Sequence, residues 1–166
     1  MPFEGVLFVE CKTDLPLVIE MNFKKCVRCA GGIGEVCNKL KDSVNSCGLV
    51  DEDPTKSRPS YLENLLRNAV ISNNHGVIVA HDKKRNNYLI VLSPDREGWL
   101  IQTAKILGIN PRSFGLPNDP KEFKKISIIN PQRVKPLIDA ILSRKHPRID
   151  ELRYAFDKCK LTGLHV

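Results

Sequence analysis

Acidic residues in one short stretch of the chain, Cys47–Pro54 (CGLVDEDP), are spaced in a way that suits phosphate chemistry. Leu49 and Val50 predict the end of a buried strand, and the proline stops any regular continuation. If the strand ends here, Asp51 and Asp53 are two residues apart and project from the same side. Two such carboxylates repel each other unless a cation neutralises them, and Mg²⁺ binds through one or two carboxylates plus substrate phosphates. An acidic turn after a strand would contain the same residue types, so the surroundings must decide between the two interpretations.

Two further strands are predicted upstream, and each ends at residues that can do chemistry. The apolar run Gly5–Glu10 predicts a strand buried on both faces that ends at Glu10. A second strand, predicted over Lys24–Ala30, runs into Gly31-Gly32-Ile33-Gly34. Helices are predicted after these two strands, over Leu15–Phe23 and Glu35–Leu40. The alternation predicts a mostly parallel α/β sheet flanked by helices, in which functional groups gather at the carboxyl ends of the strands.

The rest of the chain predicts a β-hairpin followed by helices. A helix is expected from Tyr61 to about Val70, ended by Ser72-Asn73-Asn74, and then a hairpin with strands over 76–81 and 88–92. The remaining predicted helices cover 96–107, 120–126, 131–144 and 148–160. We therefore expect an α/β domain over residues 1–108 and a helical C-terminal extension over 109–166 that packs on the same domain.

Three motifs occur in order at the expected strand ends: Glu10-Cys11-Lys12-Thr13-Asp14, Gly31-Gly32-Ile33-Gly34 and Asp51-Glu52-Asp53. This order resembles the Toprim domain, the metal-binding α/β module of topoisomerases, primases and several nucleases, over about residues 5–107. The family has a strand that ends in glutamate, usually as E-G-K-T-D, then a glycine-rich loop and then D-x-D. Cys11 stands where the family usually has glycine. A left-handed backbone at this position would make the substitution costly, whereas an extended backbone would tolerate it.

The resemblance implies a Toprim-like, Rossmann-like fold and a role for each matching acid. Glu10 would act as general acid/base or as a metal ligand, and Asp51 and Asp53 would bind Mg²⁺ or Mn²⁺. Asp14 would match the second acid of the first motif, which helps to hold metal in the OLD-type nuclease branch. Glu97 would match the further acid that this branch supplies after a later strand.

Basic and glycine residues near these acids are candidates for holding phosphate. Lys12 or Lys56 would contact the scissile phosphate, and Gly31 and Gly32 would form the loop beside it. The alternative for each lysine is a solvated surface residue.

Composition agrees with a globular protein that attracts polyanions. The 166 residues are 42% hydrophobic and 27% charged, and the formal net charge is +7. The basic excess leans toward the C-terminal third. No apolar stretch approaches the roughly 20 residues needed to span a bilayer, and Glu4 and Glu10 interrupt the N-terminal apolar run. We expect a cytoplasmic protein without a membrane partner.

The six cysteines are expected to be reduced thiols, because no signal segment is predicted. Cys26 and Cys29 have the spacing of zinc ligands, with Cys37 and Cys47 further on, but a second tight pair is lacking. A zinc or redox protein built on these four cysteines is an alternative.

The resemblance, together with the basic C-terminal third, therefore implies Mg²⁺-dependent phosphodiester chemistry on nucleic acid, DNA or RNA, by a nuclease. The alternative is a non-catalytic accessory subunit of a defence or repair complex, which binds nucleic acid and works with a separately encoded ATPase.

Overall fold

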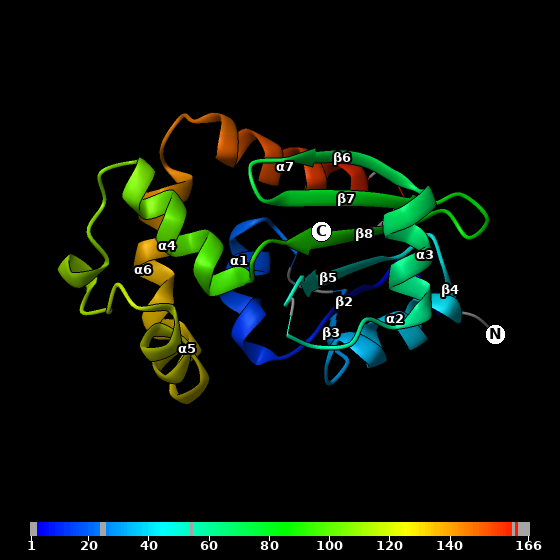
Figure 1. The fold of residues 1–166 in the computed structure, drawn as a ribbon, viewed down its shortest axis with the longest axis horizontal. Helices are drawn as coiled ribbons and strands as arrows, with labels where there is room; N and C mark the ends of the chain where they lie inside the picture. Colours follow the sequence, from blue (N-terminus) through cyan, green and yellow to red (C-terminus); the bar gives the residue numbers. More distant parts are fainter. Residues whose placement is uncertain (1–2, 24–25, 54, 161, 163–166) are drawn as a thin grey trace.

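The computed structural model describes residues 3–23, 26–53, 55–160 and 162. Within these residues, six strands form one sheet in the order β3-β2-β5-β8-β7-β6 (Figure 1). Their bounds are β2 Leu7–Val9, β3 Val27–Cys29, β5 Cys47–Asp51, β6 Val70–Asn74, β7 Val77–Asp82 and β8 Asn87–Leu92. The strands β3, β2, β5 and β8 are parallel, whereas β7 pairs antiparallel with both β8 and β6. A separate pair joins β1 (Phe3–Glu4) to β4 (Ser43–Val44).

Helices follow the strands in the order that a parallel sheet requires. The α-helices are α1 Leu15–Glu20, α2 Ile33–Lys41, α3 Ser60–Asn68, α4 Arg96–Ile106, α5 Pro120–Ile129, α6 Lys135–Leu142 and α7 Pro147–Lys160. Short 3₁₀ turns are η1 Lys12–Asp14, η2 Pro111–Phe114 and η3 Pro131–Val134. In Figure 1, α4, α5 and α6 lie beyond the arrowheads of β5 and β8, at the carboxyl ends of these strands.

Successive side chains of a strand point to opposite faces of the sheet, so the strands contribute residues to two hydrophobic cores, one on each face. Leu7 and Val9 of β2 belong to the larger core, which also contains residues of α1, α4, α6 and α7. Phe8 of the same strand belongs to the smaller core, together with residues of α2 and α3. Both faces of β2, β5 and β8 are thus covered, which explains their continuous apolar sequences, whereas the edge strand β3 is largely exposed.

The predicted α/β class is confirmed, with a mostly parallel sheet flanked by helices, and the arrangement is Rossmann-like. Some element predictions were wrong in detail. The residues expected to end a helix, Ser72-Asn73-Asn74, belong to the edge strand β6, which begins at Val70. The strand expected over Lys24–Ala30 is shorter, Val27–Cys29, and Lys24 and Lys25 lie outside the described residues. None of the helices in the described ranges has both the length and the apolar character that crossing a bilayer requires.

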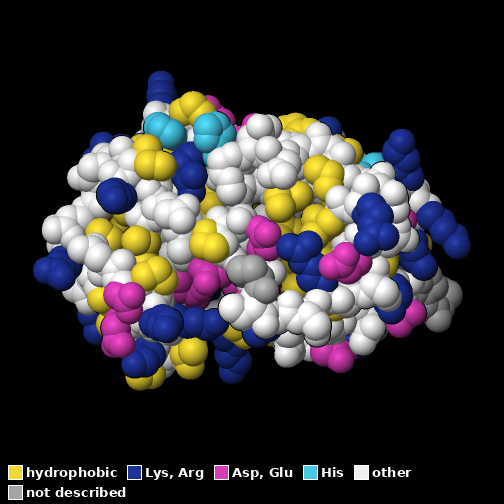
Figure 2. All heavy atoms as spheres, in the orientation of Figure 1, with side chains coloured by type: hydrophobic (Ala, Val, Ile, Leu, Met, Phe, Trp, Pro, Cys, Tyr) yellow, Lys and Arg dark blue, Asp and Glu magenta, His cyan; other side chains and the backbone are white. Residues whose placement is uncertain are grey.

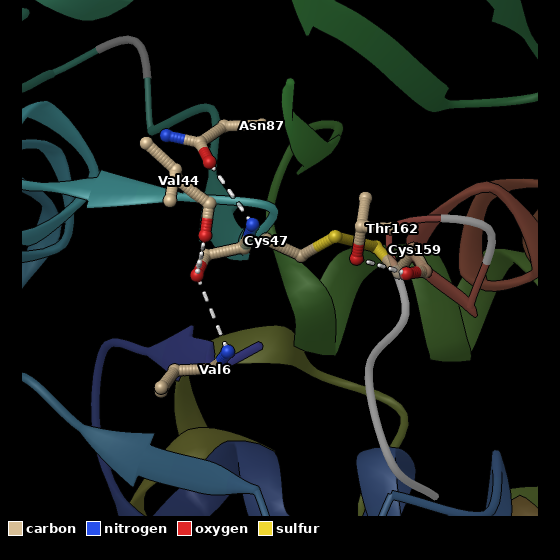
Figure 3. Close-up of a disulfide and its surroundings, with 7 residues drawn as sticks. Val6, Val44, Cys47, Asn87, Cys159 and Thr162 are labelled. Carbon is tan, nitrogen blue, oxygen red and sulfur yellow. Dashed lines mark hydrogen bonds between the residues drawn. A yellow bond between two sulfur atoms is a disulfide. The ribbon is translucent and has the colours of Figure 1, made fainter. Parts of the chain in front are cut away.

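A disulfide joins Cys47, at the start of β5, to Cys159 in α7 (Figure 3). The expectation that all six cysteines are reduced is therefore wrong for this pair. Both residues are fully buried in the larger core, where the two elements pack together. The bridge also removes Cys47 from the set of four cysteines considered for zinc.

Candidate functional site

The carboxyl ends of the parallel strands open into a cavity of about 200 Å³. All five acids predicted from the sequence line this cavity: Glu10, Asp14, Asp51, Asp53 and Glu97. Gly31, Gly32 and Lys56 line it as well, whereas Lys12 is not among its lining residues. Figure 2 shows acidic side chains in a recess of this face, close to Lys and Arg side chains. Glu10, Gly31, Asp51 and Glu97, which are between 20 and 87 positions apart in the sequence, are brought together because β2, β3, β5 and β8 end at one edge.

Hydrogen bonds tie the acids of neighbouring strands to each other's backbone. The Asp51 N–H donates to Glu10 Oε2 at 2.8 Å, so the acid that follows β2 is held against the end of β5. The Arg96 N–H donates to Asp51 Oδ1 at 2.9 Å, which links β5 to the first turn of α4. Asp95 caps that helix by accepting from the Gly98 N–H at 2.6 Å. The positions of Glu10 and Asp51 are thus fixed by secondary structure.

Asp14 reaches the cavity from η1, directly after β2. Its Oδ2 accepts from the Cys11 N–H at 3.3 Å, and the Asp14 N–H donates to the Cys11 carbonyl at 3.1 Å. Cys11 has φ −156° and ψ 178°, which is extended backbone that any residue adopts. The cysteine in place of the family's glycine therefore causes no backbone strain.

Arg96 contacts two of the acids that line the cavity and was not predicted as a site residue. It is only 2% exposed. Its Nη1 lies 3.6 Å from Asp14 Oδ1, and its Nη2 donates to Glu97 Oε1 at 2.5 Å and to Ser127 Oγ of α5 at 2.7 Å. A guanidinium that bridges two buried carboxylates supplies the positive charge that such a cluster needs.

Three carboxyl groups of the cavity, those of Glu10, Asp14 and Asp51, have a raised pKa, and burial is the main cause for each of them. Burial raises the pKa of Asp51 to about 8, helped by the negative charges of Asp14, Glu10 and Glu97. Burial and the nearby Asp14 also raise the pKa of Glu10, against the effect of its hydrogen bond from Asp51. Burial raises the pKa of Asp14, although Arg96 opposes the shift. In the absence of an added cation, Asp51 therefore favours its protonated form near neutral pH.

Asp53 approaches the cavity differently from Asp51. The strand β5 ends at Asp51, and Asp53 follows in a loop with φ 36°, so the two side chains do not share one face of a strand. Its Oδ1 accepts from Thr55 Oγ1 at 2.6 Å, and its Oδ2 lies 3.5 Å from Lys56 Nζ. Hydrogen bonds from Thr55 and the charge of Lys56 lower the pKa of Asp53, so this acid stays ionised.

The glycine pair lies between β3 and α2, where the backbone needs glycine. Gly31 has φ 110° and Gly32 has φ 143°, values that L side chains rarely adopt. The Gly31 N–H donates to the Glu10 carbonyl at 3.0 Å, and Gly32 caps α2. The positive end of this helix dipole therefore faces the cavity, where it favours an anion such as a phosphate.

Two lysines contribute positive charge at the cavity. Lys56 comes from the loop after β5, and Lys124 comes from α5 in the C-terminal part of the chain. Both charges lower the pKa of Glu10, which shows that they are near this carboxyl. Lys124 was not predicted, because nothing in its local sequence connects it with acids more than 70 residues earlier.

The donor atoms suit a hard divalent cation, but their present positions do not form a complete binding shell. Carboxylate oxygens are the ligands that Mg²⁺ and Mn²⁺ prefer. Glu97 Oε2 is buried and, within the described residues, accepts no hydrogen bond. Over the same residues, no three His, Cys, Asp or Glu side chains come together closely enough to hold a metal ion. A cation would have to draw the cavity acids toward itself.

No protein-family model matches the chain, and neither the curated proteins nor the solved structures compared with it contain a match. The assignment to the Toprim family is therefore carried by the three motifs and stays a proposal.

Proposed function

We propose that the protein is a Toprim-like, Mg²⁺- or Mn²⁺-dependent nuclease that acts on the phosphodiester bonds of DNA or RNA. The observation that carries the proposal is the meeting of all three motifs at one cavity, with Gly31-Gly32 and Lys56 beside the acids. We propose the cytoplasm as its location, because nucleic-acid substrate and Mg²⁺ occur together there.

Each group at the cavity has a part in this chemistry. Glu10, Asp51 and Asp53 would hold the cation, which when bound neutralises charge on the phosphate and on the attacking and leaving oxygens. Alternatively, Asp51 and Asp53 would hold the cation and Glu10 would act as the general acid/base, carrying a proton to or from the reacting oxygens. The α2 N-terminus, Lys56 and Lys124 would hold the phosphate, and the net charge of +7 would favour association with a polyanion.

The test is cleavage of labelled DNA and RNA with Mg²⁺ or Mn²⁺ by the wild type, Asp51→Ala and Glu10→Gln. We expect cleavage by the wild type and a loss of at least about a hundredfold in both variants, as for other groups that act directly on the reacting charge. Glu52→Gln is a matched control, since Glu52 pairs with Arg58 at 3.3 Å and does not line the cavity. Unchanged cleavage in both site variants would refute the assignment of the site.

The second candidate is a non-catalytic accessory subunit that binds nucleic acid. It would keep the fold and the metal site, and the observation that favours it is the formal net charge of +7, which attracts a polyanion without requiring any reaction. Mg²⁺-dependent binding without turnover, together with co-purification of an ATPase, would support this function over the nuclease.

A further inference from the structure

Four of the cavity acids fall into two pairs, according to whether their carboxylates contact a positively charged side chain or only backbone N–H groups. Asp14 and Glu97 share the guanidinium of Arg96. Glu10 and Asp51 instead accept hydrogen bonds from the backbone N–H groups of Asp51 and Arg96, respectively, and backbone groups carry no net charge. The charges of Lys56 and Lys124 act on Glu10 and that of Arg96 acts on Asp51, but among the described residues neither acid forms an ion pair with these groups. The need for a bound cation is therefore greatest at Glu10 and Asp51.

We propose that Arg96 takes the place of a second divalent cation, so that the site holds a single ion bound by Glu10 and Asp51 with Asp53. This inference rests on the proposed function and revises the roles of Asp14 and Glu97. These two acids become positioning residues, which hold Arg96 instead of binding metal.

The interactions of the Asp14 carboxylate, an ion pair and a hydrogen bond, support this division. Its Oδ1 faces Arg96 Nη1 at 3.6 Å, and its Oδ2 accepts from the Cys11 N–H at 3.3 Å. Both oxygens are thus engaged by the protein. A metal ion at Asp14 would have to share these oxygens with the Cys11 N–H and with the charge of Arg96, which would repel it.

Arg96 itself cannot move away without a large cost. It is 2% exposed, and Ser127 Oγ of α5 accepts from Nη2 at 2.7 Å in addition to the contact with Glu97. Removal of a guanidinium from two buried carboxylates would leave their charges uncompensated. Arginine also keeps its charge at any working pH, so a second divalent ion beside it would meet a permanent positive charge.

Glu97 Oε2 is the atom whose behaviour tests this inference most directly. It is buried, it belongs to a residue that lines the cavity, and within the described chain it accepts no hydrogen bond. If a second ion did enter, this is the free donor that it would use. The effect of substitution at Glu97 therefore separates a one-ion site from a two-ion site.

The experiment counts Mn²⁺ ions bound per chain by electron paramagnetic resonance titration of the full-length protein, with Mn²⁺ alone as the probe. We expect one ion in the wild type and one ion in Asp14→Asn and Glu97→Gln. Asp51→Asn should weaken binding by at least about tenfold, which corresponds to about 1.4 kcal/mol.

Arg96→Met should release Asp14 and Glu97 and raise the count to two, whereas Arg96→Lys, which keeps one positive charge, should keep it at one. Arg148→Met is the matched control. Arg148 is another buried arginine, but its Nε donates a hydrogen bond to Thr103 Oγ1 and its guanidinium lies over the Trp99 ring. Its substitution should leave the number of bound ions at one.

Two ions in the wild type, reduced to one by Glu97→Gln or Asp14→Asn, would overturn the inference and leave the proposed function standing. No bound ion in the wild type would instead refute the proposed function itself. If Arg96→Met does not fold, the counts in the wild type, Asp14→Asn and Glu97→Gln still decide the question.

Discussion

The surroundings of Asp51 disfavour the charged form of its carboxyl group. It is held by the Arg96 N–H and surrounded by Asp14, Glu10 and Glu97, and burial together with these charges raises its pKa to about 8. In an unfolded chain an aspartate has a pKa near 3.9. The folded protein therefore retains a proton over a pH range in which the unfolded chain has lost it.

From this shift we predict that the metal-free protein loses stability as the pH rises from about 4 to about 8. In this range the folded state binds more protons than the unfolded state, so the free energy of unfolding falls, by on the order of 1 kcal/mol per pH unit. Asp51→Asn keeps an acceptor for the Arg96 N–H but carries no charge, so its curve should be flatter and lie above the wild type near pH 8. Urea unfolding at several pH values in the presence of EDTA measures this difference.

Glu52→Gln provides the control for this measurement, because Glu52 is partly exposed and paired with Arg58. Its pH dependence should match that of the wild type. Equal slopes for the wild type and Asp51→Asn would contradict the assigned pKa.

The acids of the site were predictable from the sequence, but their counter-charges were not. Glu10 and Asp51 follow apolar runs, and a strand end is visible in the sequence itself. Arg96 stands at the polar start of a helix, where a charged residue is normally solvated, and its burial depends on α5, which begins 24 residues later. Local sequence carries no signal for such a long-range contact.

At the scale of elements, β5 can approach α2 closely because position 48 has no side chain. A Cβ built on Gly48 would lie 2.8 Å from Leu40 Cδ1 and 2.9 Å from both Leu89 Cδ1 and Val36 Cγ1. Each of these atoms belongs to a fully buried side chain of the smaller core. The packing of β5, which carries Asp51, thus depends on this glycine.

We predict that Gly48→Ala destabilises the protein by about 1–3 kcal/mol, because three buried side chains must shift at once. Gly34→Ala is the matched control, since a Cβ at Gly34 in α2 meets nothing within 4 Å. This substitution should stabilise the protein by roughly 0.5–1 kcal/mol, the usual gain of alanine over glycine in a helix. Thermal unfolding of both variants measures the two effects, and a loss at Gly34 as large as that at Gly48 would contradict the packing explanation.

Elements with strong apolar patterns were predicted well, whereas the edge strands of the sheet, whose apolar patterns are weak, were not. The strands β2, β5 and β8 are buried on both faces, and their sequences show it. The edge strand β6 has the polar sequence Ser72-Asn73-Asn74, typical of turns, and its place in the sheet comes from pairing with β7. Its structure therefore depends on a neighbouring strand more than on its own residues.

At the scale of the whole molecule, the disulfide joins the strand that carries Asp51 to the last described helix. Cys47 and Cys159 are 112 residues apart, so the bridge closes a loop that contains most of the chain. We predict that reduction lowers the free energy of unfolding by roughly 2–5 kcal/mol, because the unfolded chain regains the freedom that the bridge removed. Denaturant unfolding with and without a phosphine reductant measures this loss.

A Cys47→Ala/Cys159→Ala double variant is the control for the reductant. Its stability should be low in both conditions and unaffected by the phosphine. A wild type equally stable with and without reductant would show that the bridge contributes nothing to folding.

The same bridge determines how the molecule would respond to mechanical force. Tension applied to the two chain ends would pass through residues 1–47, across the sulfur–sulfur bond and out through 159–166, so the enclosed residues would carry none of it. Stretching the oxidised protein to its full length would leave the 112-residue loop unextended, and reduction would release roughly 370–400 Å of additional chain. Asp51 and Arg96 lie inside that loop, whereas Glu10 and Gly31 precede Cys47 and lie outside it. Force would therefore pull the first two motifs away from the site, while Asp51 and Arg96 would remain on a part of the chain that is not stretched.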